Sequence, residues 1–103
     1  MSRLILVIVL MCSAFSAHAD QFVITQKNLA FSNPLKVIHP GDQIIFTNKD
    51  NISHNIVSLT SGFQFDLGVL PSGASKTVTF KNAGVADIQC TIHPNMKMTL
   101  FVF

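Results

Sequence analysis

The sequence predicts an all-β fold, a Greek-key sandwich or barrel of about seven or eight strands. No helical periodicity is present, short runs rich in β-branched and aromatic residues recur along the chain, and turn-forming residues separate these runs. The chain has 103 residues, and removing an expected 19-residue leader leaves 84, which is enough for one domain with a single core.

The expected strands follow one another at short intervals, and each is bounded by residues that favour turns. In order, they are QFVIT (21–25), LKVI (35–38), QIIFTN (43–48), HNIVSL (54–59), FQFDLGVL (63–70), KTVTF (76–80), VADIQC (85–90) and MTLFVF (98–103). The segments between them include SNP, HPGD, NKDN, TSG, PSGAS and KNAG.

Alternation along 85–90 orients the cysteine of that strand. Ala86, Ile88 and Cys90 share one face, and because that face is apolar we expect the thiol to point inward at the end of the strand. The strand at 98–103 shows no clean alternation. Met98, Leu100 and Val102 lie on one face and Phe101 and Phe103 on the other, so either face can be the core, and the phenylalanines can form an exposed apolar patch.

The N-terminal residues are typical of a secretory signal peptide. Arg3 precedes an apolar run at 4–11, and Ala17 and Ala19 supply the small residues that signal peptidase requires. The run is too short to span a bilayer as a helix. We therefore expect residues 1–19 to be removed and residues 20–103 to form a domain exported to the periplasm.

Charge and cysteine content limit the function classes. Residues 20–103 carry six lysines and five aspartates, a net charge of +1, which gives no reason to expect binding to nucleic acid or to an anionic membrane. Loss of Cys12 with the leader leaves Cys90 without a disulfide partner. An unpaired thiol in an oxidising compartment indicates another role, such as metal binding.

The segment CTIHPNMKM at 90–98 combines a thiol, an imidazole and two thioethers. This mixture favours copper, because zinc seldom uses methionine as a ligand. A further strong ligand must come from elsewhere, and the remaining imidazoles of 20–103 are His39 and His54. His39 lies in the turn signal HPGD, which favours a solvated side chain. His54 begins an apolar strand, and together with the loop at 90–98 it is the better candidate.

The chain resembles the cupredoxins, the small blue copper proteins, and in particular the plastocyanin and amicyanin branch. The similarity lies in IHPGDQIIFTNKDNISHNIVS and in GASKTVTFKNAGVADIQCTIHPNM, and it covers almost all of 20–103. This resemblance implies a cupredoxin-like fold and one copper ion bound by His54, Cys90, His93 and a methionine. It also implies that the Asn55 side chain forms a hydrogen bond near Thr91 and joins the two ligand-bearing segments.

Two methionines compete for the remaining ligand position. Relatives of the amicyanin type place it three residues after the ligand histidine, which selects Met96, and relatives of the plastocyanin type place it five after, which selects Met98. We expect Met96, because the length of chain that follows it matches the final strand of both kinds of relative. Met98 then begins that strand on the face of Leu100 and Val102.

The resemblance implies a protein that transfers single electrons between redox partners rather than an enzyme. Partners are expected to dock weakly beside His93 and Pro94, within an apolar ring, on a monomeric protein. A periplasmic copper-delivery protein with the same ligands is the alternative. An enzyme is disfavoured, because Cys90 and His93 share one loop without a third orienting group.

Overall fold

Residues 19–103, which the computed structural model describes, form nine strands and no helix. The strands are β1 (Gln21–Lys27), β2 (Ala30–Phe31), β3 (Leu35–Ile38), β4 (Gln43–Asn48), β5 (His54–Ser58), β6 (Phe65–Leu70), β7 (Ser75–Thr79), β8 (Gly84–Gln89) and β9 (Lys97–Val102). The expected signal peptide lies outside the described residues except for Ala19. No helix in the described part of the chain is long and apolar enough to cross a membrane.

The predicted all-β class is confirmed, and the eight expected runs all contain strands. One further strand, β2, was not expected, because a strand of two residues is too short to show alternation. It pairs antiparallel with β1 across the two-residue turn Asn28–Leu29. Both turn residues have left-handed backbone conformations, with φ of 55° and 60°, as a tight hairpin of this kind requires.

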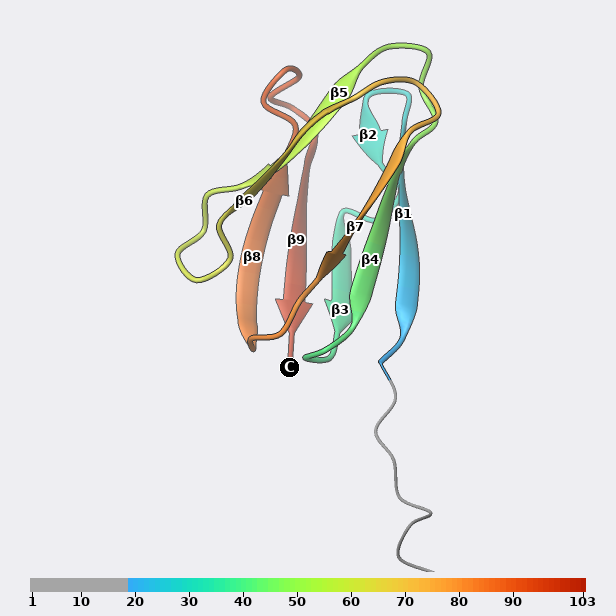
Figure 1. Ribbon diagram of the computed structural model, residues 1–103. Coiled ribbons are helices and arrows are strands. Elements are labelled where there is room, and N and C mark those ends of the chain that lie inside the picture. Colours follow the sequence, from blue (N-terminus) through green and yellow to red (C-terminus); the bar gives the residue numbers. More distant parts are fainter. Residues whose placement is uncertain (1–18) are drawn as a thin grey trace, which may run out of the picture.

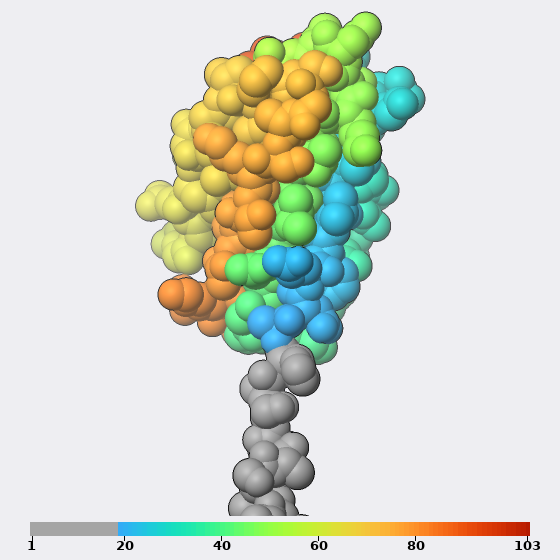
Figure 2. Space-filling view, turned by 45° about the vertical axis from the view of Figure 1, so that its right-hand side comes forward, coloured from blue at the N-terminus to red at the C-terminus, as the bar shows by residue number. Residues whose placement is uncertain are grey.

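The strands form two sheets that pack face to face (Figure 1). The four-stranded sheet has the order β2-β1-β4-β7, and the five-stranded sheet has the order β3-β9-β8-β5-β6. Two neighbouring pairs, β1 with β4 and β3 with β9, are parallel, and the others are antiparallel. Figure 2 shows the outer face of the smaller sheet, where β7, β4 and β1 lie side by side.

The core lies between the sheets and follows the alternation of the strands. In β8 the inward face predicted from the sequence is confirmed, because Ala86, Ile88 and, just beyond the strand, Cys90 are fully buried. In β9, Met98, Leu100 and Val102 point inward, whereas Phe103 is 64% exposed. The other buried apolar side chains of this core are Ile24, Phe31, Ile38, Ile44, Phe46, Ile56, Leu70, Phe80 and Met96.

One end of the sandwich gathers three segments that are distant in sequence. The β1–β2 turn, the start of β5 and the β8–β9 loop all lie at the top of Figure 1. The opposite end holds the C-terminal residue Phe103, whose carbonyl oxygen is 2.8 Å from His39 Nδ1. His39 is exposed there, as its turn signal predicts, and its contact with Phe103 places it at the end of the sandwich away from the start of β5.

Candidate metal centre

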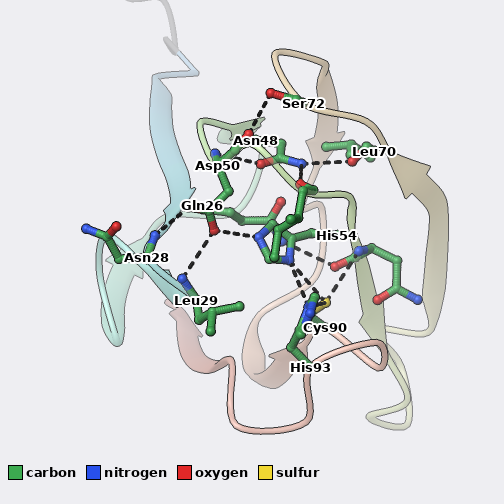
Figure 3. Close-up of polar contacts among 12 residues, drawn as sticks. Gln26, Asn28, Leu29, Asn48, Asp50, His54, Leu70, Ser72, Cys90 and His93 are labelled. Atoms are coloured by element: carbon green, nitrogen blue, oxygen red, sulfur yellow. Dashed lines mark hydrogen bonds and ion pairs between the residues drawn. The ribbon is translucent and has the colours of Figure 1, made fainter.

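Three side chains with metal-binding atoms converge at the end of the sandwich where β5 begins. The imidazole nitrogens His54 Nδ1 and His93 Nδ1 are 3.2 Å apart, and Cys90 Sγ is 3.7 Å from the first and 3.9 Å from the second. All three donor atoms lie within 4.8 Å of one another, and Figure 3 shows them pointing toward a common centre. Cys90 and His93 lie 36 and 39 positions after His54 in the sequence, and the fold brings the three side chains together.

The strands fix two of these side chains. His54 is the first residue of β5, which lies between β6 and β8, and its side chain is fully buried. Cys90 directly follows β8, the neighbour of β5, and is also fully buried. Two adjacent strands of one sheet therefore place an imidazole and a thiol side by side without relying on a mobile loop.

Asn55 connects the two ligand-bearing segments through three hydrogen bonds. Its backbone N–H donates to Cys90 Sγ at 3.4 Å, and its side-chain amide donates to Thr91 Oγ1 at 2.6 Å. The Thr91 backbone N–H donates back to Asn55 Oδ1 at 2.7 Å. The contact expected between Asn55 and Thr91 is confirmed. Hydrogen bonds around a metal site hold the ligands in orientation and influence the properties of the metal.

The β8–β9 loop is closed across its base by backbone hydrogen bonds of Met96. Its N–H donates to the His93 carbonyl at 2.9 Å, and its carbonyl accepts from the Cys90 N–H at 3.0 Å. Its side chain is buried. Met98 is two residues further on, inside β9 opposite Ile88, and is also buried. The choice of Met96 as a ligand stays a prediction.

His93 is the ligand candidate nearest to solvent. It is half-buried, and it lines a surface hollow together with Leu29, Ile92, Pro94, Asn95 and Met96. Leu29 is 51% exposed and Ile92 is 46% exposed. Apolar side chains therefore surround the accessible side of His93.

Asp50 is a residue of this site that sequence reasoning missed. Its Oδ2 lies 2.7 Å from His54 Nε2, on the side of the ring away from Cys90 (Figure 3). Burial alone would raise the pKa of the Asp50 carboxyl, but hydrogen bonds from His54 and from the backbone of Asn28 and Leu29 outweigh it and lower the pKa. The signal in the sequence was an aspartate four residues before a candidate ligand histidine, in DNISH.

The chemistry of these donors fits copper. Two imidazoles and a thiolate form the trigonal set of a blue-copper site, which a weak thioether ligand completes. The thiol is buried and has no disulfide partner among the described residues, so it is free to bind a metal. A β-sandwich that holds such donors at one end belongs to the class of small copper proteins.

Comparison with known proteins gives the family. The profile of copper-binding proteins of the plastocyanin/azurin family matches residues 18–103. Methylamine utilization protein MauL of Methylorubrum extorquens is 33% identical over 86 residues, which cover 82% of this chain and 75% of MauL. The chain belongs to the plastocyanin/azurin family, and the expected copper cofactor is confirmed.

Solved structures support the fold. A copper(I) form of an amicyanin variant superposes with a TM-score of 0.76 at 20% identity, with 88% of each chain covered. A copper-containing nitrite reductase, NirK from Thermus scotoductus, superposes with a TM-score of 0.74 at 23% identity. This match covers 79% of the present chain but only 22% of NirK, so it concerns the fold of one part of that enzyme.

Proposed function

We propose that this protein is an exported blue copper protein that transfers single electrons between redox partners, with His54, Cys90, His93 and Met96 as the copper ligands. The observation that carries the proposal is the convergence of two imidazole nitrogens and one buried thiol within 4.8 Å. Bound copper supplies a one-electron couple between its cuprous and cupric states. His54, Cys90, His93 and Met96 would hold the ion with a mixed set of nitrogen and sulfur donors, which suits both oxidation states and would limit rearrangement between them.

The surroundings of the site support electron transfer rather than catalysis. Cys90 and His54 are fully buried, so a substrate has no direct access to either side chain. His93 alone reaches the surface, in the apolar hollow beside Leu29 and Ile92. A redox partner that docks against this hollow would lie next to a ligand of the metal, and such encounters are typically small and weak.

Export to the periplasm belongs to the same proposal. It rests on the signal peptide expected at 1–19, with residues 20–103 as the copper-binding domain. The net charge of +1 for that domain gives no reason to expect binding to nucleic acid or to an anionic surface.

Copper addition tests the ligand set. We expect copper(II) to give the purified protein an intense visible absorption band from a copper–thiolate bond. Cys90→Ser should lack the band while keeping its fold in circular dichroism, because serine has nearly the same shape. A wild-type protein that binds copper without the band would contradict the proposal.

A second measurement separates electron transfer from copper delivery. An electron-transfer protein should be reduced and reoxidised repeatedly without losing copper, and it should exchange electrons rapidly between its own oxidised and reduced forms. A delivery protein should instead release copper readily to a competing chelator. Fast release with slow self-exchange would reject the shuttle in favour of delivery.

A further inference from the structure

Asp50 touches the ligand histidine at the ring nitrogen that does not face the metal centre. The distance from Asp50 Oδ2 to His54 Nε2 is 2.7 Å, and the aspartate side chain is only 10% exposed. His54 itself is fully buried, so this carboxylate is the group that satisfies its outer nitrogen. The hydrogen bond is therefore protected from competition with solvent.

The carboxylate is held in place by groups from several parts of the chain. Oδ1 accepts the backbone N–H of Asn28 at 2.6 Å, and Oδ2 accepts that of Leu29 at 3.2 Å. The Asp50 backbone is also bound, because its N–H donates to Asn48 Oδ1 and its carbonyl accepts from Ser72 Oγ. Asp50 thus cannot turn away from His54 without breaking contacts to the β1–β2 turn.

The contact determines which nitrogen of His54 carries the proton. An ionised carboxylate only accepts hydrogen bonds, so Nε2 must carry the hydrogen. The lone pair of a neutral imidazole is then on Nδ1, which faces Cys90 and His93. The copper-free protein accordingly presents His54 in the form that a metal ion requires.

The negative charge of Asp50 has a second consequence. An anion beside a ligand of a metal stabilises the more highly charged state of the metal, and the effect is strong where burial lowers the local dielectric. A cupric ion carries one more positive charge than a cuprous ion. The carboxylate therefore favours the oxidised state of a centre that includes His54.

We propose that Asp50 is a positioning residue of the copper centre, which holds His54 in the Nε2–H form and lowers the reduction potential of the site. This inference rests on the proposed function, because it takes His54 as a copper ligand. The β1–β2 turn then also contributes to the metal centre, because the backbone amides of Asn28 and Leu29 hold the Asp50 carboxylate in place.

The reduction potential of charge-matched variants tests the electrostatic part. Asp50→Asn removes the charge and should shift the potential upward. The control Asp66→Asn removes the same charge from an exposed position in β6, where the side chain accepts the N–H of Gly68, and should leave the potential unchanged. Equal potentials in Asp50→Asn and the wild type would overturn this part.

Nuclear magnetic resonance of the copper-free protein tests the positioning part without any metal. The ring nitrogen shifts of His54 should show hydrogen on Nε2 in the wild type and a mixture of both tautomers in Asp50→Ala. Asp50→Ala should also bind copper about 10- to 100-fold more weakly. Hydrogen on Nδ1 in the wild type would overturn the inference even if both variants failed to fold.

The two levels of the proposal fail in different ways. Absence of the copper–thiolate band in the wild type would reject the proposed function. Presence of the band together with an unchanged potential in Asp50→Asn would reject only the role of Asp50. The tautomer measurement needs no copper and is independent of both results.

Discussion

Asn55 occupies a position where one side chain joins both halves of the metal centre. Its amide forms two hydrogen bonds with Thr91, and its backbone N–H reaches the sulfur of Cys90. The side chain is half-buried, so these bonds are partly shielded from water. Residues that orient ligands in this way restrict the motion of the site as well as stabilising the fold.

Replacing Asn55 by alanine should lower both the stability of the fold and the affinity of the site for copper. Loss of two side-chain hydrogen bonds is expected to lower the free energy of unfolding by about 1–3 kcal/mol, measured by chemical denaturation of the copper-free protein. Copper affinity should fall about 10- to 100-fold. The control Asn82→Ala changes an exposed amide in the β7–β8 turn and should alter neither quantity. An affinity unchanged in Asn55→Ala would show that the bridge does not orient the ligands.

A matched pair of substitutions decides between the two methionines. Met96→Leu should change the visible spectrum and raise the reduction potential, because the site loses a sulfur donor. Met98→Leu should leave both unchanged and alter stability by less than about 1.5 kcal/mol, because it replaces one core side chain by another of similar volume. The reverse pattern would identify Met98 as the ligand.

The residues of the site differ in how far the sequence predicts them. Cys90 and His93 share one short segment, and alternation along β8 correctly predicts that the thiol points inward. Asp50 lies only four residues before His54, but the amides that fix its carboxylate belong to the β1–β2 turn, 21 and 22 residues earlier in the chain, so spacing alone does not assign its role. Sequence spacing reveals ligands that cluster, but it does not reveal contacts that only the packed fold creates.

At the scale of elements, Gly84 shows how tightly the start of β8 is packed. Its φ is +146°, and a Cβ atom at this position would lie 2.8 Å from a ring carbon of Phe63. Phe63 is partly buried and packs against the core, so moving its ring away would cost part of that packing. Both the backbone conformation and the close ring therefore favour a glycine where β8 begins.

Gly84→Ala should consequently destabilise the protein more than an alanine at another glycine of the fold. Gly73→Ala, at φ +85° with open space around the site, should cost about 1–2 kcal/mol from backbone strain alone. Gly84→Ala adds a steric clash of about 1–3 kcal/mol. Thermal or chemical unfolding measures the difference. Equal losses in the two variants would mean that Phe63 moves aside without cost.

Most elements follow closely from the sequence, but the orientation of the last strand and the existence of β2 do not. The predicted strands are present because alternating apolar residues fit the two faces of each sheet. The ambiguous strand at the C-terminal end was resolved only by packing, which buries Met98, Leu100 and Val102 and leaves Phe103 exposed. Strand β2 escaped prediction because its two residues form a strand only through pairing with β1.

At the scale of the whole molecule, Asp42 links segments at the end of the sandwich away from the metal centre. Its carboxylate accepts the backbone N–H groups of Asp20 and His39, at 2.9 Å and 2.8 Å, and it is almost fully buried. The hydrogen bonds from Asp20 and His39 lower the pKa of Asp42 below its ordinary value of 3.8, against the opposing effect of burial.

This lowered pKa predicts how stability depends on pH. A carboxyl whose pKa is lower in the folded state stabilises the protein fully above its unfolded value, and this contribution is lost as the pH falls through the folded value. The free energy of unfolding should therefore decrease on acidification below about pH 4. In that range the free energy of unfolding of Asp42→Asn should fall less steeply with pH than that of the wild type. The variant Asp66→Asn, at an exposed position, should follow the wild type. An equally steep fall for Asp42→Asn and the wild type would contradict the lowered pKa of Asp42 as the cause.

The place of β9 in its sheet constrains the order in which the protein can form. This strand follows the other eight along the sequence, yet it lies between β3 and β8, and β3 has no other neighbour in the sheet. The ribosome must therefore synthesise β9 before the larger sheet can be completed. Until then the nascent polypeptide lacks a complete hydrophobic interior, so the stable sandwich and the ligand-bearing end that it supports can form only after the last strand has been made.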